Sequence, residues 1–331
     1  MAEVYFSKDI EPILEKIDYS RLGKNVAIKT HFGERGCITY IDPKLVKKVY
    51  DKIVSLGKKC ALIECNVLYR GSRTIRKDHL KIAKEHGFDF APIDILDGEK
   101  GEEYIEVDVN GLVDKAMLGK GLKKYDSMVV LTHFKGHGFA GYGGVFKNIG
   151  MGLGSRAGKL HMHSAVMPYI DKSTCTGCET CIKNCPADAI ALVKGKAEIN
   201  QKKCIGCAMC VSVCPTRVVQ VPWDGSTSEE VEKRIVDYTS AVMKIIPKEK
   251  MVFINVLKNI TPECDCKSFK QKPMMEDIGV LFSYDPVAVD KASLDLAGEK
   301  FDKINKIYKS VQVNRAAEKG MGSKEYEIIE I

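Results

Sequence analysis

Short apolar runs alternate with amphipathic stretches along residues 26–134. Residues 26–29, 60–64 and 127–132 are rich in β-branched and other apolar side chains, which predicts buried strands. Between the first two, residues 42–54 begin with an Asp-Pro pair and continue with apolar residues at helical spacing, which predicts a capped helix. This alternation is typical of βα units that build a largely parallel sheet.

The same pattern resumes near the C-terminal end. Residues 228–246 have the spacing of a long amphipathic helix, 251–257 and 278–282 are apolar strand-length runs, and 286–297 begins another helix. Between the two parts lie a glycine-rich stretch, residues 136–158, which we expect to be a loop, and a cysteine-rich block. The part of the chain before the cysteine-rich block and the part after it each supply too few strands to complete a sheet alone. We therefore predict an α/β fold whose mostly parallel open sheet has helices on both faces.

Eight of the 13 cysteines occur in two runs of the same spacing, each reading C-x-x-C-x-x-C-x-x-x-C-P. This spacing brings three thiolates onto one tight loop, whereas the fourth cysteine ligates the other cluster. We therefore expect two 4Fe–4S clusters, the first bound by Cys175, Cys178, Cys181 and Cys214, and the second by Cys204, Cys207, Cys210 and Cys185. Paired zinc knuckles are the alternative, but zinc sites rarely interlock eight cysteines in this way.

Residues 172–216 closely resemble the bacterial two-cluster ferredoxin family, and the resemblance implies low-potential, one-electron carriers. The predicted organisation is an inserted α+β ferredoxin-like module, residues 169–220, between a first part of the α/β domain, residues 1–168, and a second part, residues 221–331. Three separate domains in a row are the alternative.

Charge and apolar content limit the class of protein. No apolar run reaches the roughly 18 to 20 residues of a membrane-spanning helix, and the N-terminal residues lack a basic stretch followed by an apolar one. We therefore expect a cytoplasmic protein without membrane contacts. The net charge of +7 is spread over mixed helical faces, which makes nucleic acid an unlikely partner. A mild positive field suits an acidic redox partner, such as a ferredoxin-like protein or an oxidoreductase, or an anionic small-molecule ligand.

Polar residues follow the predicted strands at their carboxyl ends, where open α/β sheets bind ligands. Residues 132–163 hold four of the seven histidines together with many glycines, a combination that suits an anion. The candidate catalytic residues are His31, Glu34, His133, His137 and Lys147, and His31 or Glu34 could serve as a general base. The acidic residues 276–277 are expected to complete the pocket, with solvated surface charge as the alternative.

Five cysteines lie outside the two runs. Cys264 and Cys266 lie in a loop beyond a predicted strand, where two thiols so close in sequence could chelate a metal or bind the edge of a further cluster. Cys37 lies in a loop at the same edge of the sheet. We therefore consider a third metal site formed by Cys264, Cys266 and Cys37, whereas Cys60 and Cys65 read as small apolar fillers.

Outside the cysteine block the chain resembles the family called domain of unknown function 362, in residues 26–34, 133–163, 276–279 and 285–290. That resemblance implies an iron–sulfur protein of unassigned reaction. The segment from His137 to Tyr142, followed by Lys147, is similar to a loop of the nickel-pincer lactate racemase family, in which such a histidine and lysine hold a nucleotide-derived cofactor. Here the glycine pair is shifted by one position, which favours a shared anion-binding loop over a shared cofactor.

Three functions follow from these features. The first is an oxidoreductase, in which electrons from a partner protein cross the two clusters and reach a ligand or metal in the α/β domain. The second is a non-catalytic electron carrier or assembly factor acting on a protein partner, and the third is a ligand-binding sensor that responds to cluster redox state. Convergence of the candidate residues on one cavity near the second cluster would favour the first function.

Overall fold

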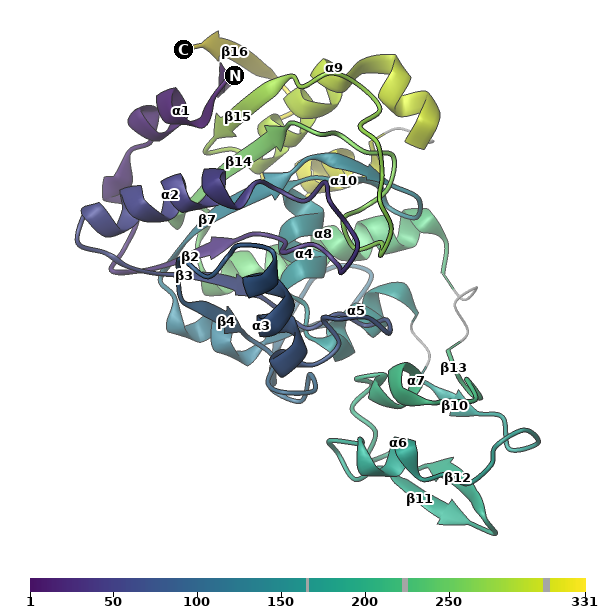
Figure 1. Cartoon of the computed structure of the whole chain (residues 1–331). Coiled ribbons are helices and arrows are strands. Elements are labelled where there is room, and N and C mark those ends of the chain that lie inside the picture. The colour runs from purple at the N-terminus through teal and green to yellow at the C-terminus, as the bar shows by residue number, and fades with distance from the viewer. Residues whose placement is uncertain (165–166, 222–225, 306–309) are drawn as a thin grey trace.

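The computed structural model describes residues 1–164, 167–221, 226–305 and 310–331, and its centre is an eight-stranded sheet (Figure 1). The strand order is β16-β1-β15-β14-β7-β2-β3-β4. The strands are β1 (Ala2–Ser7), β2 (Asn25–Lys29), β3 (Lys59–Glu64), β4 (Ile93–Ile95), β7 (Ser127–His133), β14 (Met251–Leu257), β15 (Gly279–Ser283) and β16 (Tyr326–Glu330). Among these described strands five of the seven pairings are parallel, and both antiparallel pairings involve β15. The predicted mostly parallel sheet is confirmed.

Helices cover both faces of this sheet. One face carries α1 (Ile10–Lys16), α2 (Pro43–Ser55) and α3 (Arg76–Glu85), and the other carries α4 (Val145–Leu153), α8 (Ser228–Ile245), α9 (Pro286–Asn305, broken at Gly298) and α10 (Val311–Glu318). Strand β7 is buried along its whole length and alternates between the two cores: Met128 and Val130 belong to one, Val129 and Leu131 to the other. No described helix has the length and apolar character needed to cross a bilayer.

Both flanks of the cysteine block contribute to this one sheet. Strand β14, from the second flank, pairs in parallel with β7, from the first, so that Met251 lies beside Met128. Residues 169–220, all of them described, add no strand to it. They form a small lobe of β10 (Tyr169–Ile170), α6 (Thr180–Lys183), β11 (Ile190–Val193), β12 (Lys196–Ile199), α7 (Met209–Val213) and β13 (Val219–Gln220). In Figure 1 this lobe lies at one end of the molecule, with α7 facing the α/β domain.

The glycine-rich stretch, residues 136–158, is not the loop that its composition suggested. It contains a short hairpin of β8 (Lys135–His137) and β9 (Gly141–Gly143), then α4 and the start of α5 (Arg156–His163). A Cβ atom added at Gly150 would lie 2.1 Å from the backbone oxygen of Ile235 on α8. The glycine therefore permits close packing of two helices, a tertiary requirement that overrides its weak helix propensity.

Smaller elements complete the chain. A second hairpin, β5 (Tyr104–Asp108) with β6 (Lys115–Gly119), lies outside the main sheet. Short 3-10 helices span Tyr19–Arg21, Lys120–Lys124 and Lys248–Lys250. At the start of α2 the side chain of Asp42 accepts a hydrogen bond from the amide of Lys44, and Pro43 lies in the first turn, as predicted.

Candidate functional site

A cavity of about 970 Å³ lies where the parallel strands β2, β3, β7 and β14 end. Its walls come from the loops that follow these strands and from α4 and α5. This is the edge at which open α/β sheets bind ligands. Candidate residues from three distant parts of the sequence line it: His31, Glu34, His133, His137, Lys147, Cys264 and Cys266.

The wall of this cavity is strongly cationic. Eight basic side chains line it, namely Lys29, Arg35, Arg70, Arg73, Lys135, Lys147, Lys159 and Lys267, against three acidic ones, Glu34, Glu64 and Glu263. Lys29 and Glu64 form a buried ion pair at 3.1 Å, so part of this charge is balanced internally. The remaining excess of positive charge favours an anionic ligand.

Arg73 organises one side of the cavity. This fully buried guanidinium lies 3.4 Å from the Glu34 carboxylate and 3.0 Å from Nε2 of His31. Burial, reinforced by the charge of Arg73, holds the pKa of His31 well below its usual value, so the imidazole is neutral. Burial alone would raise the pKa of Glu34, but Arg73 and hydrogen bonds from Ser72 lower it. Glu34 is therefore an ionised carboxylate already occupied by donors, which makes it a poor general base.

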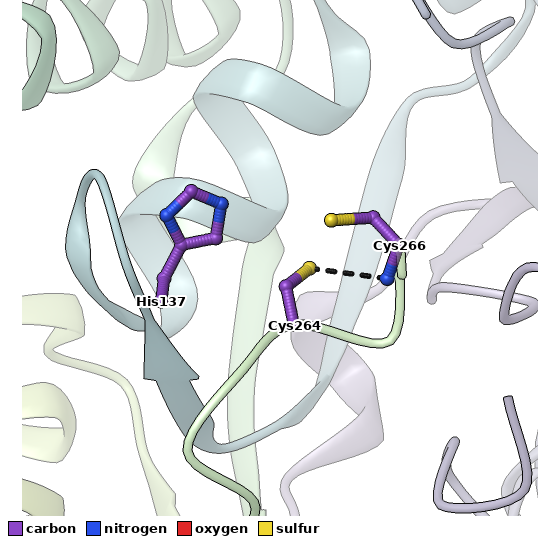
Figure 2. Close-up of side chains that lie close together, drawn as sticks. All are labelled: His137, Cys264 and Cys266. Atoms are coloured by element: carbon purple, nitrogen blue, oxygen red, sulfur yellow. Dashed lines mark hydrogen bonds between the residues drawn. The ribbon is translucent and has the colours of Figure 1, made fainter. Parts of the chain in front are cut away.

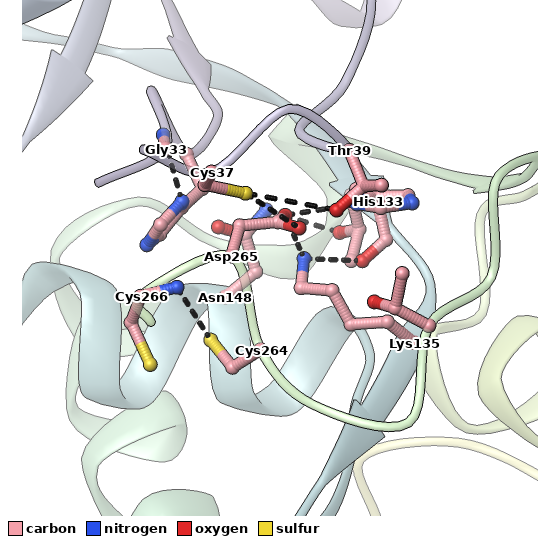
Figure 3. Close-up of polar contacts among 12 residues, drawn as sticks. Gly33, Cys37, Thr39, His133, Lys135, Asn148, Cys264, Asp265 and Cys266 are labelled. Carbon is pink, nitrogen blue, oxygen red and sulfur yellow. Dashed lines mark hydrogen bonds and ion pairs between the residues drawn. The ribbon is translucent and has the colours of Figure 1, made fainter. Parts of the chain in front are cut away.

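Asp265, between the two loop cysteines, is the centre of a second buried network (Figure 3). Its carboxylate lies 2.8 Å from Nδ1 of His133 and 2.8 Å from Nζ of Lys135. Burial alone would raise the pKa of Asp265, but His133 and Lys135 hold it well below its usual range. The other nitrogen of His133 lies 2.9 Å from the backbone oxygen of Lys258. His133 therefore presents no unoccupied nitrogen to the cavity, and we assign it a positioning role.

Cys264, Cys266 and His137 converge on one point in the cavity wall (Figure 2). One ligand-type atom from each, a sulfur or a ring nitrogen, lies within 4.8 Å of the others. Cys264 Sγ accepts hydrogen bonds from the amide of Cys266 at 3.3 Å and from Lys147 Nζ at 3.5 Å. Cys37 does not belong to this group. Its sulfur contacts Thr39 Oγ1 at 3.6 Å, and the residue does not line the cavity. His137 thus takes the place that the sequence had suggested for Cys37.

The cysteines of the small lobe gather into two groups. Cys175, Cys178, Cys181 and Cys214 line one small pocket, and the charge of Cys185 raises the pKa of Cys204, Cys207 and Cys210, where burial is the larger cause. The two runs also share their backbone conformation: Gly177 and Gly206 both have φ of 67°. Cys214, the fourth cysteine of the second run, therefore lies with the first three of the first run, and Cys185 is near enough to Cys204, Cys207 and Cys210 for its charge to act on them.

Arg156, on α5, joins this lobe to the cavity wall. Its buried guanidinium donates to the backbone oxygen of Cys207 at 2.9 Å and to Ser212 Oγ at 2.9 Å. The nitrogen that donates to Ser212 also donates to the backbone oxygen of Leu68 at 3.3 Å, and Leu68 lines the cavity. Arg156 was not singled out from the sequence, because it lies in the stretch that was expected to be a loop. Its role could not be found from the sequence because the partners of its guanidinium lie 51 to 89 residues away.

Comparison with known proteins adds a family to this geometry. The family model described as domain of unknown function (DUF362) matches residues 26–295. The chain belongs to this family. No curated protein matches the DUF362 chain.

Two solved structures resemble it in fold. One is the lactate racemase apoprotein from Thermoanaerobacterium thermosaccharolyticum, with 15% sequence identity and a TM-score of 0.40, covering 77% of this chain and 50% of that one. The other is a protein from Thermotoga maritima, with 10% identity and a TM-score of 0.42, covering 85% and 56%. The DUF362 chain thus spans about half the length of these structures.

The DUF362 stretches outside the cavity have structural roles. Asp290 is fully buried and accepts hydrogen bonds from the amide of Val145 at 2.8 Å and from Asn255 Nδ2 at 2.8 Å, so it caps the helix that carries Lys147. The acidic residues 276–277 are exposed and do not line the cavity, so the alternative of solvated surface charge describes them. The carboxylate of Asp277 instead accepts from the amide of Asn259 at 2.7 Å, which fixes a turn.

Proposed function

We propose that this chain is an iron–sulfur redox protein in which two 4Fe–4S clusters, bound by residues 169–220, exchange electrons with an anionic ligand held in the cavity of the α/β domain. Cys175, Cys178, Cys181 and Cys214 would hold the first cluster, and Cys204, Cys207, Cys210 and Cys185 the second. Bound clusters of this type supply one-electron transfer.

The donor set of the small lobe fits such clusters. Two groups of four thiols match the ligand count of two cubanes, and the crossed membership of Cys185 and Cys214 is the arrangement that this spacing produces. The repeated positive φ at Gly177 and Gly206 brings backbone amides close to each group without steric cost. Zinc knuckles have no need for this exchange of ligands between runs.

The observation that carries the proposal is the contact made by Arg156. It binds the backbone of Cys207, a ligand of the proposed second cluster, to residues that line the cavity. A free-standing carrier has no need of a buried arginine with this many fixed partners. The arrangement therefore favours electron exchange between the lobe and the cavity.

The opposite side of the lobe suits a redox partner protein. Cys178 is exposed, and Leu192, 41% exposed, would lie 3.8 Å from a Cβ atom placed at Gly177 in the same cysteine loop. An exposed apolar side chain beside a proposed cluster ligand is typical of a docking surface. This feature also favours the second candidate function, a non-catalytic electron carrier or assembly factor acting on a protein partner.

Anaerobic analysis of iron and sulfide, with EPR of the reduced protein, tests the proposal. We expect about eight irons and eight sulfides per chain, with two interacting S = 1/2 signals. Zinc in place of iron, or a single cluster, would refute it.

Leu192→Asp should slow reduction by a ferredoxin-like donor while the iron content stays unchanged. Lys159→Met removes one positive charge from the cavity wall. It should weaken anion binding if the cavity holds the ligand, whereas a protein that is only an electron carrier would bind no anion there.

A further inference from the structure

The two cysteines of the cavity wall have unlike surroundings. A hydrogen bond from Cys266, helped by the charge of Lys147, holds the pKa of Cys264 well below its usual value, whereas the same contact and burial raise the pKa of Cys266. Burial would lower the pKa of Lys147, but Cys264 and Cys266 raise it. The reduced pair is thus a thiolate and a thiol that share one proton beside a fixed ammonium group. Such pairs are the reactive form in thiol–disulfide chemistry.

We propose that Cys264 and Cys266 form a redox-active dithiol that stores two electrons at the wall of the cavity. The Cys264–Cys266 disulfide takes up two electrons and one proton; the S–S bond breaks, the proton goes to Cys266, and Cys264 is left as a thiolate beside Lys147. The two electrons come from the two reduced clusters, one from each. This step rests on the proposed function, because it assigns those clusters as the reductant, and it explains why two one-electron carriers would serve one cavity.

The sulfur atoms are already close enough for this chemistry. Their separation is no more than 4.8 Å, and both cysteines belong to one short turn, so side-chain rotations account for most of the approach to a disulfide. Asp265 fixes that turn, through its carboxylate on His133 and Lys135 and through its backbone oxygen, which accepts from the amide of Glu34 at 2.9 Å. A turn fixed in this way preorganises the two sulfurs.

A metal ion bound by the same three residues is the competing interpretation, and the hydrogen bonds of His137 argue against it. The amides of Phe139 and Ala140 donate to Nδ1 of His137, at 3.2 and 2.9 Å. A neutral imidazole that accepts at Nδ1 carries its proton on Nε2. A ligating histidine normally donates from the nitrogen that does not bind the metal, and this ring cannot do so while the two amides occupy Nδ1. A protonated Nε2 instead offers a donor towards the thiolate.

The tryptic peptide of residues 259–267 reports directly on this pair, because it contains both cysteines and no other. The cluster-loaded, full-length protein is equilibrated anaerobically in dithiothreitol buffers of different poise, quenched, and labelled with N-ethylmaleimide after denaturation. We expect the peptide to carry either two labels or none, and the unlabelled disulfide form to be two hydrogens lighter than the unlabelled dithiol. The fraction of labelled peptide, plotted against the redox potential of the buffer, should have the slope of a two-electron couple. Iron is counted on the same samples.

Lys147→Met tests the environment of the thiolate. Without the ammonium the pKa of Cys264 should rise, because Lys147 is one of the groups that lower it. The equilibrium constant for forming the disulfide then rises about tenfold, which lowers the midpoint potential by about 30 mV. Lys270→Met is the matched control, since it removes the same charge from an exposed position of the same loop and should leave the midpoint unchanged.

Two results would overturn the inference. The first is a peptide that carries two labels at every redox potential at which the iron is retained, so that no disulfide forms. The second is a native protein that holds one zinc or other metal per chain, which blocks labelling of the peptide and is absent from Cys264→Ala; the group would then be a metal site. Either result in a protein with about eight irons per chain refutes only the proposed dithiol. If instead the Cys264–Cys266 disulfide forms and is reduced in a protein without iron, the proposed function is refuted.

Discussion

Arg156→Lys tests the connection between the small lobe and the cavity wall. The guanidinium makes hydrogen bonds of 2.9 Å to Cys207, 2.9 Å to Ser212 and 3.1 Å to the backbone oxygen of Thr74. A lysine keeps the charge but is a single point donor, so it cannot reach partners on both sides of a planar fork. If two of these charge-assisted hydrogen bonds are lost, at about 2 kcal/mol each, the local contact weakens by about 4 kcal/mol.

Hydrogen exchange measures this loss at the place where it occurs. The amides of Ser212 and Cys214 are hydrogen-bonded within or beside α7, and they should exchange about a thousandfold faster in Arg156→Lys, because each 1.4 kcal/mol corresponds to about a factor of ten. Strand β7 should be unaffected. Arg234→Lys is the matched control: this arginine also donates to a backbone oxygen and to a hydroxyl, Ser226 Oγ, but it does not contact the lobe. Unchanged exchange at α7 in Arg156→Lys would refute the reasoning.

Three further substitutions test the α/β domain. Lys29→Met leaves the buried carboxylate of Glu64 without its ion-pair partner and should lower the free energy of unfolding by about 4 kcal/mol, measured by urea titration. The double variant Lys29→Met/Glu64→Leu, which removes both charges, should recover most of this loss. Asp290→Ala removes the acceptor for the first amide of α4 and for Asn255, so we expect a loss of about 3 kcal/mol by the same measurement. Burial holds the pKa of His79 well below 6.5, so the unfolded chain binds a proton below pH 6.5 that the folded chain does not. Between pH 6.5 and 5.5 the wild type should therefore lose about 1 kcal/mol more stability than His79→Phe, and equal slopes would contradict this.

Local signals predicted the frame of the fold well. The apolar run at residues 251–257 coincides with β14, because a strand buried on both faces reads as continuous apolar sequence. The helix from Pro43 carries its own N-cap and its own apolar stripe, so it too is visible in the sequence. Such features depend on neighbours within a few residues, and tertiary contacts only reinforce them.

Features that depend on distant neighbours were mispredicted or missed. The glycine at position 150 was taken as a loop signal, whereas its meaning comes from Ile235 on another helix. Asp265 was missed, because nothing near it in the sequence shows that His133, 132 residues earlier, donates a hydrogen bond to its carboxylate. The candidate residues of the cavity were found more readily, since the carboxyl ends of parallel strands meet at one edge whatever their order in the chain.

The charge of Lys147 connects the proposed dithiol to the proposed ligand. When Cys264 is a thiolate, this ammonium is engaged at 3.5 Å; when the pair is a neutral disulfide, the same ammonium is released to an anion in the cavity. The anion should therefore bind more tightly to the oxidised protein than to the reduced one. Because such coupling is reciprocal, the bound anion must stabilise the disulfide by the same factor and lower its midpoint potential. Reduction of the Cys264–Cys266 pair would then lower the affinity for the anion, so that reduction of the disulfide and release of the ligand are thermodynamically coupled.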